Sequence, residues 1–138
     1  MESTELDKQI ERAAELVLGS QYLVALVGAG MSVESGIPPF RGPGGIWTKY
    51  GEPAMDGYKR LLQDPKGYWL ERISDTGPMA EFRETFARAK PNPGHLAIAD
   101  LEALGLMKYI ITQNVDNLHQ MAGSRNVAEI HGNSTKLR

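Results

Sequence analysis

The stretch YLVALVGAGMSVESGIPPFRGPGGIW, residues 22–47, decides the fold of this chain. It opens with an apolar run over 22–27, rich in Val and Leu, and Gly28 and Gly30 follow directly. A short apolar run bounded by glycine predicts a buried strand. Glycine after a strand allows a sharp turn and a close approach of a ligand to the backbone, and a phosphate is the usual ligand where a helix follows.

This glycine pattern is not the common dinucleotide-binding fingerprint, because Val33 stands where G-x-G-x-x-G needs its third glycine. By itself Gly-x-Gly indicates only a tight strand-to-helix turn. The longer string GAGxSxxSGIPxFRG at 28–42 resembles the cofactor-binding signature of the sirtuins, the NAD-dependent protein deacylases. The strings TQNVDNLH at 112–119 and EIHG at 129–132 resemble the second signature of that family and the segment that carries its catalytic histidine.

The resemblance implies an NAD-dependent protein-lysine deacetylase, a transferase and hydrolase that moves an acyl group from lysine to ADP-ribose and releases nicotinamide. Its partner would be the acetylated lysine of a protein. By resemblance His131 would be the catalytic base and Asn114 would orient the ribose or a water, roles that suit an imidazole and an amide. The residues that would bind NAD are Gly28, Ala29, Gly30, Ser32, Gly36, Ile37, Phe40, Arg41, Trp47, Gln113, Asn114, Asp116 and His131.

Within that set the resemblance implies distinct contacts. Residues 28–32 would hold the diphosphate through backbone N–H groups and a hydroxyl. Asp116 would bind the nicotinamide amide, and Ile37 and Phe40 would wall off its ring. Arg41 would approach the ribose or the phosphates, and Gln113 would bind ribose. A preference for acetyl-lysine is expected by resemblance only.

Composition limits the alternatives. The chain has 138 residues, of which 41% are hydrophobic and 23% charged, as expected for a single domain with a core. The net charge of −2 gives no basic excess for direct binding to nucleic acid or to an anionic membrane. No apolar run approaches the roughly 20 residues that span a bilayer. The polar N-terminus lacks the pattern of a secretory signal, so we expect a cytoplasmic location.

The chain contains no cysteine, so we expect no Cys-based metal site within it. Sirtuins carry two pairs of cysteines that hold a structural zinc beyond the catalytic histidine, and this sequence stops soon after His131. We therefore expect 1–138 to form one incomplete catalytic domain that lacks the zinc module and the C-terminal Rossmann half. About 50–90 would belong to a small helical module.

Periodicity places the motifs on an α/β fold, a partial Rossmann-like parallel sheet flanked by helices. Strands are predicted over 22–27, 106–111 and 126–130, and helices over 6–18, 92–104 and 117–121. Helical pieces within 54–90 would be separated at Asp64-Pro65 and Gly77-Pro78. The Gly- and Pro-rich segment 37–50 is predicted to be a long loop that folds over a ligand.

The residues leave several alternatives open. Mono-ADP-ribosyl transfer would use the same intermediate, and a non-catalytic NAD-binding fragment would use the same nucleotide. The other two histidines, His95 and His119, are expected at the surface or beside helix caps. The face of the 92–104 helix marked by Ala97, Leu101 and Leu104 is expected to be buried, and so are the aromatic residues of 54–90.

Overall fold

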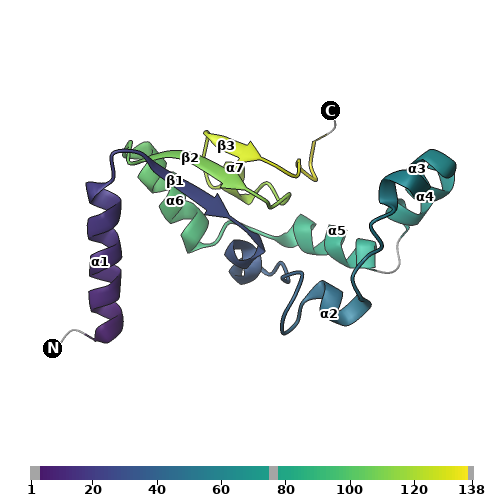
Figure 1. The fold of residues 1–138 in the computed structure, drawn as a ribbon, viewed down its shortest axis with the longest axis horizontal. Coiled ribbons are helices and arrows are strands. Elements are labelled where there is room, and N and C mark those ends of the chain that lie inside the picture. Colours follow the sequence, from purple (N-terminus) through teal and green to yellow (C-terminus); the bar gives the residue numbers. More distant parts are fainter. Residues whose placement is uncertain (1–3, 75–77, 137–138) are drawn as a thin grey trace. The chain divides into compact units, whose positions relative to one another are not determined.

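The computed structural model describes residues 4–74 and 78–136 and divides into two compact units (Figure 1). The first, the sheet unit, comprises Met1–Gly28 and Pro93–Arg138, and the second, the loop-helix unit, comprises Ala29–Asn92. The sheet unit contains α1 (Glu5–Gly19), β1 (Leu23–Val27), α6 (Pro93–Ala103), β2 (Met107–Thr112), α7 (Leu118–Met121) and β3 (Val127–Glu129). The loop-helix unit contains the 3₁₀ helix η1 (Ala29–Ser35), α2 (Ile46–Tyr50), α3 (Gly57–Gln63), α4 (Pro65–Ile73) and α5 (Pro78–Arg88).

The predicted parallel sheet is confirmed. Its strand order is β1-β2-β3 and both pairs are parallel. In the register, Val27 lies opposite Thr112, and Thr112 lies opposite Glu129. The carboxyl ends of all three strands therefore meet at one edge, where parallel α/β sheets bind ligands.

The core of the sheet unit is formed where β2 and α7 bury their apolar side chains. Ile110 is fully buried and Leu118 is 1% exposed. Helix α6 packs against β2 and α7. The predicted phase of α6 was wrong, because Ala97 is exposed and Leu104 is 73% exposed, whereas His95 is fully buried. Apolar residues surround most of this helix, so their spacing cannot identify the face that meets the sheet.

Helix α1 begins as the sequence predicts. Thr4 caps it, and the side chains of Thr4 and Asp7 form a reciprocal capping box, with the Asp7 N–H donating to Thr4 Oγ1 at 3.2 Å. None of its described side chains is buried, and Ile10 on its apolar face is 58% exposed. No described helix is long and apolar enough to cross a membrane.

Two expectations for the loop-helix unit are corrected. The turn after β1 leads into a 3₁₀ helix, and the end of the predicted loop 37–50 is helix α2. The last five residues of that segment contain no glycine or proline, and Gly45 starts the helix as its N-cap.

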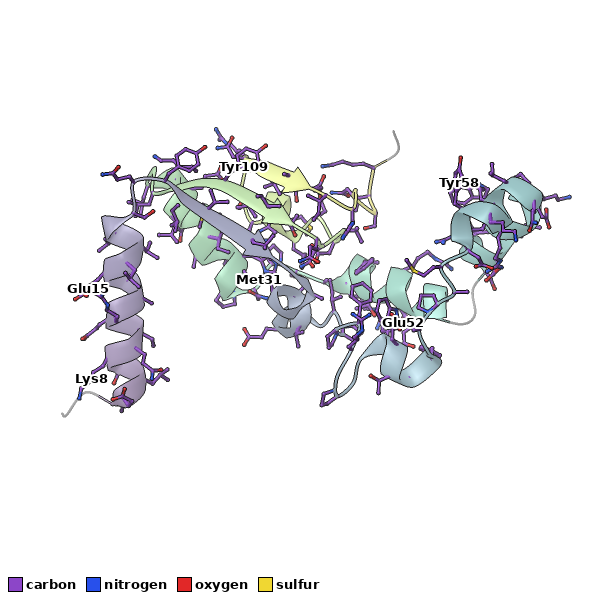
Figure 2. All side chains as sticks on the ribbon, in the orientation of Figure 1. Lys8, Glu15, Met31, Glu52, Tyr58 and Tyr109 are labelled. Carbon is purple, nitrogen blue, oxygen red and sulfur yellow. The ribbon has the colours of Figure 1, made fainter. Side chains whose placement is uncertain are left out.

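Two aromatic side chains of α3 and α4 are also exposed, against expectation, whereas Tyr68 of α4 is half-buried. Tyr58 is 75% exposed and Trp69 is 55% exposed (Figure 2). These short helices pack mainly with each other and with α5, so little surface covers them. Helix α3 ends before Asp64-Pro65 as predicted, whereas the predicted break at Gly77 lies outside the described residues.

Candidate functional site

The first and second signature strings meet at the carboxyl ends of β1 and β2. The Asn114 side chain donates from Nδ2 to the carbonyl oxygen of Gly28 at 3.0 Å. The backbone N–H of Gln113 donates to the carbonyl oxygen of Val27 at 2.9 Å. Thr112 Oγ1 accepts from the Asn114 N–H at 3.0 Å and fixes the bend after β2. The start of the glycine turn and the Gln113-Asn114 pair are thus tied by hydrogen bonds across the sheet edge.

Asp116 stands in the turn that follows. Its side chain is buried, and its Oδ1 accepts from the N–H of Leu118 at 3.0 Å. Asn117, between them, has a φ of +64°, a left-handed conformation that asparagine adopts more readily than most residues. The Asp116 side chain thus accepts from the N–H of the first residue of the helix, which starts at Leu118 after its N-cap residue Asn117.

His131 follows β3 at the same edge. The Ile130 N–H donates to the carbonyl oxygen of Thr112 at 3.1 Å, which continues the pairing with β2. The Gly132 N–H then donates to the carbonyl oxygen of Glu129 at 3.2 Å, and Gly132 has a φ of +84°. This turn leaves His131 exposed at its apex, where its imidazole is accessible to a ligand.

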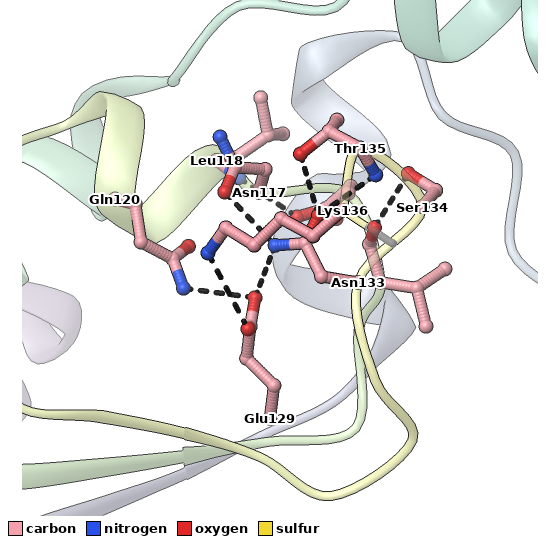
Figure 3. Close-up of polar contacts among 10 residues, drawn as sticks. Asn117, Leu118, Gln120, Glu129, Asn133, Ser134, Thr135 and Lys136 are labelled. Atoms are coloured by element: carbon pink, nitrogen blue, oxygen red, sulfur yellow. Dashed lines mark hydrogen bonds and ion pairs between the residues drawn. The ribbon is translucent and has the colours of Figure 1, made fainter. Parts of the chain in front are cut away.

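Glu129 anchors a polar network beside this turn (Figure 3). Its side chain is only 8% exposed, and its Oε1 accepts from Gln120 Nε2 at 2.8 Å and also from Asn133 Nδ2. Lys136 Nζ lies 3.7 Å from its Oε2. No pattern in the sequence indicates this network, because its members are scattered polar residues joined only by the fold.

A pair of buried imidazoles corrects the expectation for two histidines. His95 on α6 is fully buried, and His119 on α7 is 1% exposed. Their ring centroids are 4.9 Å apart. Burial lowers the pKa of both, the proximity of His95 lowers the pKa of His119 further, and the negative charge of Asp116 opposes this in each. Both rings are therefore favoured in the neutral form.

In the loop-helix unit, η1 and the residues after it carry the rest of the first signature. Ser32 is 1% exposed, and its carbonyl oxygen accepts from the Ile37 N–H at 3.2 Å. Ile37 is 6% exposed, so its side chain belongs to the core of this unit here. Gly36 between them has a φ of +86°, which suits glycine. Asn92 Nδ2 donates to the carbonyl oxygen of Met31 at 2.8 Å and so links the end of this unit to η1.

The glycine-rich segment closes on itself before α2. The N–H groups of Ile46 and Trp47 donate to the carbonyl oxygens of Pro39 and Phe40 at 3.0 and 2.9 Å. The Phe40 and Trp47 rings lie 5.1 Å apart, and the Arg41 guanidinium lies 4.3 Å from the Trp47 ring centroid. These three predicted cofactor residues thus form one cluster.

Helix α2 is tied to α5 by ionic contacts. Glu81 accepts from Lys49 Nζ at 2.8 Å and from the Tyr50 hydroxyl. The hydrogen bond to Glu81 raises the pKa of Lys49 to about 12, and the same contacts lower the pKa of Glu81. Glu81 also lines a pocket of about 250 Å³, together with Ser35, Gly36, Glu84, Thr85, Arg88 and Ala89.

The predicted site residues therefore form two groups. Gly28, Gln113, Asn114, Asp116 and His131 share one edge of the sheet unit. The residues from Ala29 to Trp47 lie in the loop-helix unit. Among the described residues, no group of three or more His, Asp or Glu side chains is placed to hold a metal ion.

Comparison with known proteins relates the whole pattern to one family. The Sir2 family model matches residues 28–138. A curated relative, an NAD-dependent protein deacetylase of Caldivirga maquilingensis, is 50% identical over 126 residues, which is 91% of this chain and 46% of the relative. The chain spans about half the length of the curated relatives it matches.

Solved structures also match this chain over about half of their own length. A mutant Sir2 homologue in complex with ADP-ribose superposes with a TM-score of 0.71 at 43% identity, covering 89% of this chain and 47% of the other. A Sir2 complex with a p53 peptide and NAD⁺ superposes with a TM-score of 0.68 at 36% identity, covering 90% and 46%. Both identities exceed the level at which only a fold is shared.

Proposed function

The chain belongs to the Sir2 family, and on that premise we propose that it forms the NAD-binding part of an NAD-dependent protein-lysine deacetylase. The observation that carries the proposal is the Asn114–Gly28 hydrogen bond, since it joins two family signatures at the sheet edge from which His131 projects. The three motifs lie far apart in the sequence, and the fold brings these residues of them together at one edge.

The groups at the sheet edge suit a dinucleotide. A Cβ at Gly28 would lie 3.7 Å from Gln113 Nε2, so the Gly28 backbone and the Gln113 amide are neighbours at this edge. The exposed amide of Gln113 can bind ribose hydroxyls, and the Asp116 carboxylate can accept from a carboxamide. Residues 29–32 and the cluster of Phe40, Arg41 and Trp47 would contribute the remaining contacts by their match to the signature.

The chemical roles follow from the side chains at this edge. When bound, NAD supplies an anomeric carbon that becomes electrophilic as nicotinamide leaves. His131 would take a proton from a ribose hydroxyl, so that this hydroxyl can attack the acyl carbon while that carbon is still joined to the lysine nitrogen. Asn114 would orient the ribose or a water. Acyl-lysine, NAD and one water would then give free lysine, nicotinamide and O-acyl-ADP-ribose.

The substrate is proposed to be an acetylated lysine of a protein. The support comes from relatives, one of which is described as a protein deacetylase and another as a complex with a p53 peptide. A second candidate function, NAD binding without catalysis, would use the same groups at the sheet edge and would differ only in lacking turnover.

The decisive experiment is calorimetric titration of the chain with NAD, with Asn114→Ala and His131→Ala as variants and circular dichroism as a check on folding. We expect saturable binding that Asn114→Ala weakens more than His131→Ala does. An acetyl-peptide assay with product analysis then separates deacetylation from mono-ADP-ribosyl transfer. A folded chain that binds no NAD contradicts the proposal, and a chain that binds NAD without turnover supports the second candidate.

A further inference from the structure

The buried carboxylate of Glu129 calls for an explanation. It lies at the last residue of β3 and is only 8% exposed. Removing a carboxylate from water is unfavourable unless charged and hydrogen-bonding partners compensate. Gln120, Asn133 and Lys136 supply those partners, and they come from α7 and from the segment after His131.

Asn133 connects this carboxylate to the second signature (Figure 3). Its Nδ2 donates both to Glu129 Oε1 and to Asn117 Oδ1, the latter at 2.9 Å. Its Oδ1 accepts from the N–H and the hydroxyl of Thr135 at 2.8 and 2.6 Å. Both hydrogen-bonding groups of the Asn133 amide are thus engaged, which fixes its orientation.

Ser134 adds a second tie to the same turn. Its N–H and its hydroxyl both donate to the carbonyl oxygen of Val115, at 2.8 and 2.7 Å. The segment after His131 is therefore bound to the turn 115–117, which contains Asp116. On the other side, Ile130 is bound to Thr112. Only His131 and Gly132 separate these two anchors.

We propose that Glu129 is a positioning residue for His131, holding the His131-Gly132 turn against the turn 115–117 through Asn133. The carboxylate does not act on the substrate. It sets where the imidazole stands relative to Asn114, and the inference rests on the proposed function because that function gives His131 its role as base.

Glu102 offers a matched control at the opposite end of β3. Its two carboxylate oxygens accept from the N–H groups of Arg125 and Asn126 at 2.9 and 2.8 Å, just before the strand begins. Both carboxylates secure the same strand, but only Glu129 lies beside His131. A purely structural role would make Glu129→Ala and Glu102→Ala behave alike.

The first measurement needs no NAD. Amide hydrogen exchange of the chain would be followed at residues 130–133, with the imidazole signal of His131 identified by its loss in His131→Ala. For Glu129→Ala we expect at least tenfold faster exchange at 130–133 and a shifted His131 signal, with Ile110 still protected. For Glu102→Ala we expect neither change at His131. Unchanged exchange at 130–133 in Glu129→Ala would overturn the proposal, as would an equal response to Glu102→Ala.

The second measurement uses a preparation of the chain that binds NAD, and it separates the two chemical stages of the reaction. Nicotinamide exchange reports the stage before His131 acts as base, and deacetylation requires both stages. We expect Glu129→Ala to lower kcat for deacetylation at least tenfold while nicotinamide exchange stays within about twofold, and Glu129→Gln to recover part of the loss. A parallel fall of both rates would overturn the positioning role. If the unaltered chain deacetylates nothing, the proposed function fails, whereas hydrogen exchange still decides the role of Glu129.

Discussion

The two units hold their signature residues by different means. In the sheet unit, Asn114, Asp116 and Asn133 are fixed by hydrogen bonds in part-buried or buried surroundings. In the loop-helix unit, Arg41 pairs with Glu52 at 2.7 Å although these side chains are 72% and 61% exposed. Pairs exposed to this degree contribute only about 0–1 kcal/mol, because water and salt screen them. These contacts indicate that the sheet edge is preformed, whereas the exposed ion pair of Arg41 with Glu52 does little to hold its loop in place.

The largest expected effect comes from breaking the tie between the signatures with Asn114→Ala. This change removes the hydrogen bond to Gly28 and leaves a carbonyl oxygen at the sheet edge without that donor. A loss of this kind costs about 1–3 kcal/mol. We expect a lower urea midpoint and at least tenfold weaker NAD binding, measured by urea denaturation and calorimetry. Gln113→Ala is the control, since the Gln113 backbone bond to Val27 survives it; its midpoint should barely move.

The next effect tests the loop itself with Gly45→Ala. A Cβ at this position would lie 2.8 Å from the Arg41 carbonyl carbon and 2.9 Å from the Phe40 oxygen, so the backbone around the cluster must shift. We expect changed Trp47 emission in a Trp69→Phe background. Gly19→Ala is the matched control, because nothing lies within 4 Å of its added Cβ. Equal spectra for the two variants would contradict the close packing of this loop.

A smaller effect concerns the pH dependence of stability, which should reflect the burial of His95 and His119 in the sheet unit. The pKa values of His95 and His119 are lowered in the folded chain below the ordinary value of 6.5. Below about pH 6.5 the unfolded chain therefore binds more protons than the folded chain. The free energy of unfolding keeps its full value above that pH and decreases as the pH drops. Urea midpoints at pH 7.5 and 5.5 would check this. In His119→Phe the difference should shrink, and a midpoint that rises on acidification would refute the assignment.

The smallest effect is expected for Glu52→Gln, which removes the exposed partner of Arg41. The free energy of unfolding should change by less than about 1 kcal/mol, and 0.5 M NaCl should abolish the difference. Thermal melts at low and high salt measure it. A loss comparable to that of Asn114→Ala would show that the loop is as firmly held as the sheet edge.

Much of the fold was predictable because its signals are local. Strand β1 ends at Val27, just before Gly28, and helix α6 begins at Pro93, where glycine and proline act on their own backbone. The phase of α6 was not predictable, since it depends on which apolar side the sheet covers. Helix α2 was missed because glycine and proline are frequent in the residues just before it. Gly45 is the last of them, and the helix begins directly after it.

The site divides in the same way. The resemblance to the family signatures pointed to Asn114, Asp116 and His131, and the structure brings them to one edge. The sequence did not point to Glu129 or to the buried pair of His95 and His119, because their partners come from separate elements. Long-range pairing of polar groups leaves no periodic trace in a sequence.

The place of the loop-helix unit in the chain also affects how the protein folds. That unit is inserted between β1 and α6, so β1 and β2 must find each other across the whole insertion before the sheet exists. The entropy of closing a loop rises slowly, by about 0.6 kcal/mol for each doubling of length, whereas folding slows as contacts become less local. Shortening or exchanging the insertion would therefore alter the refolding rate far more than the stability of the sheet. The length of the insertion would thus set the pace of folding while leaving the energy of the strand pairing nearly unchanged.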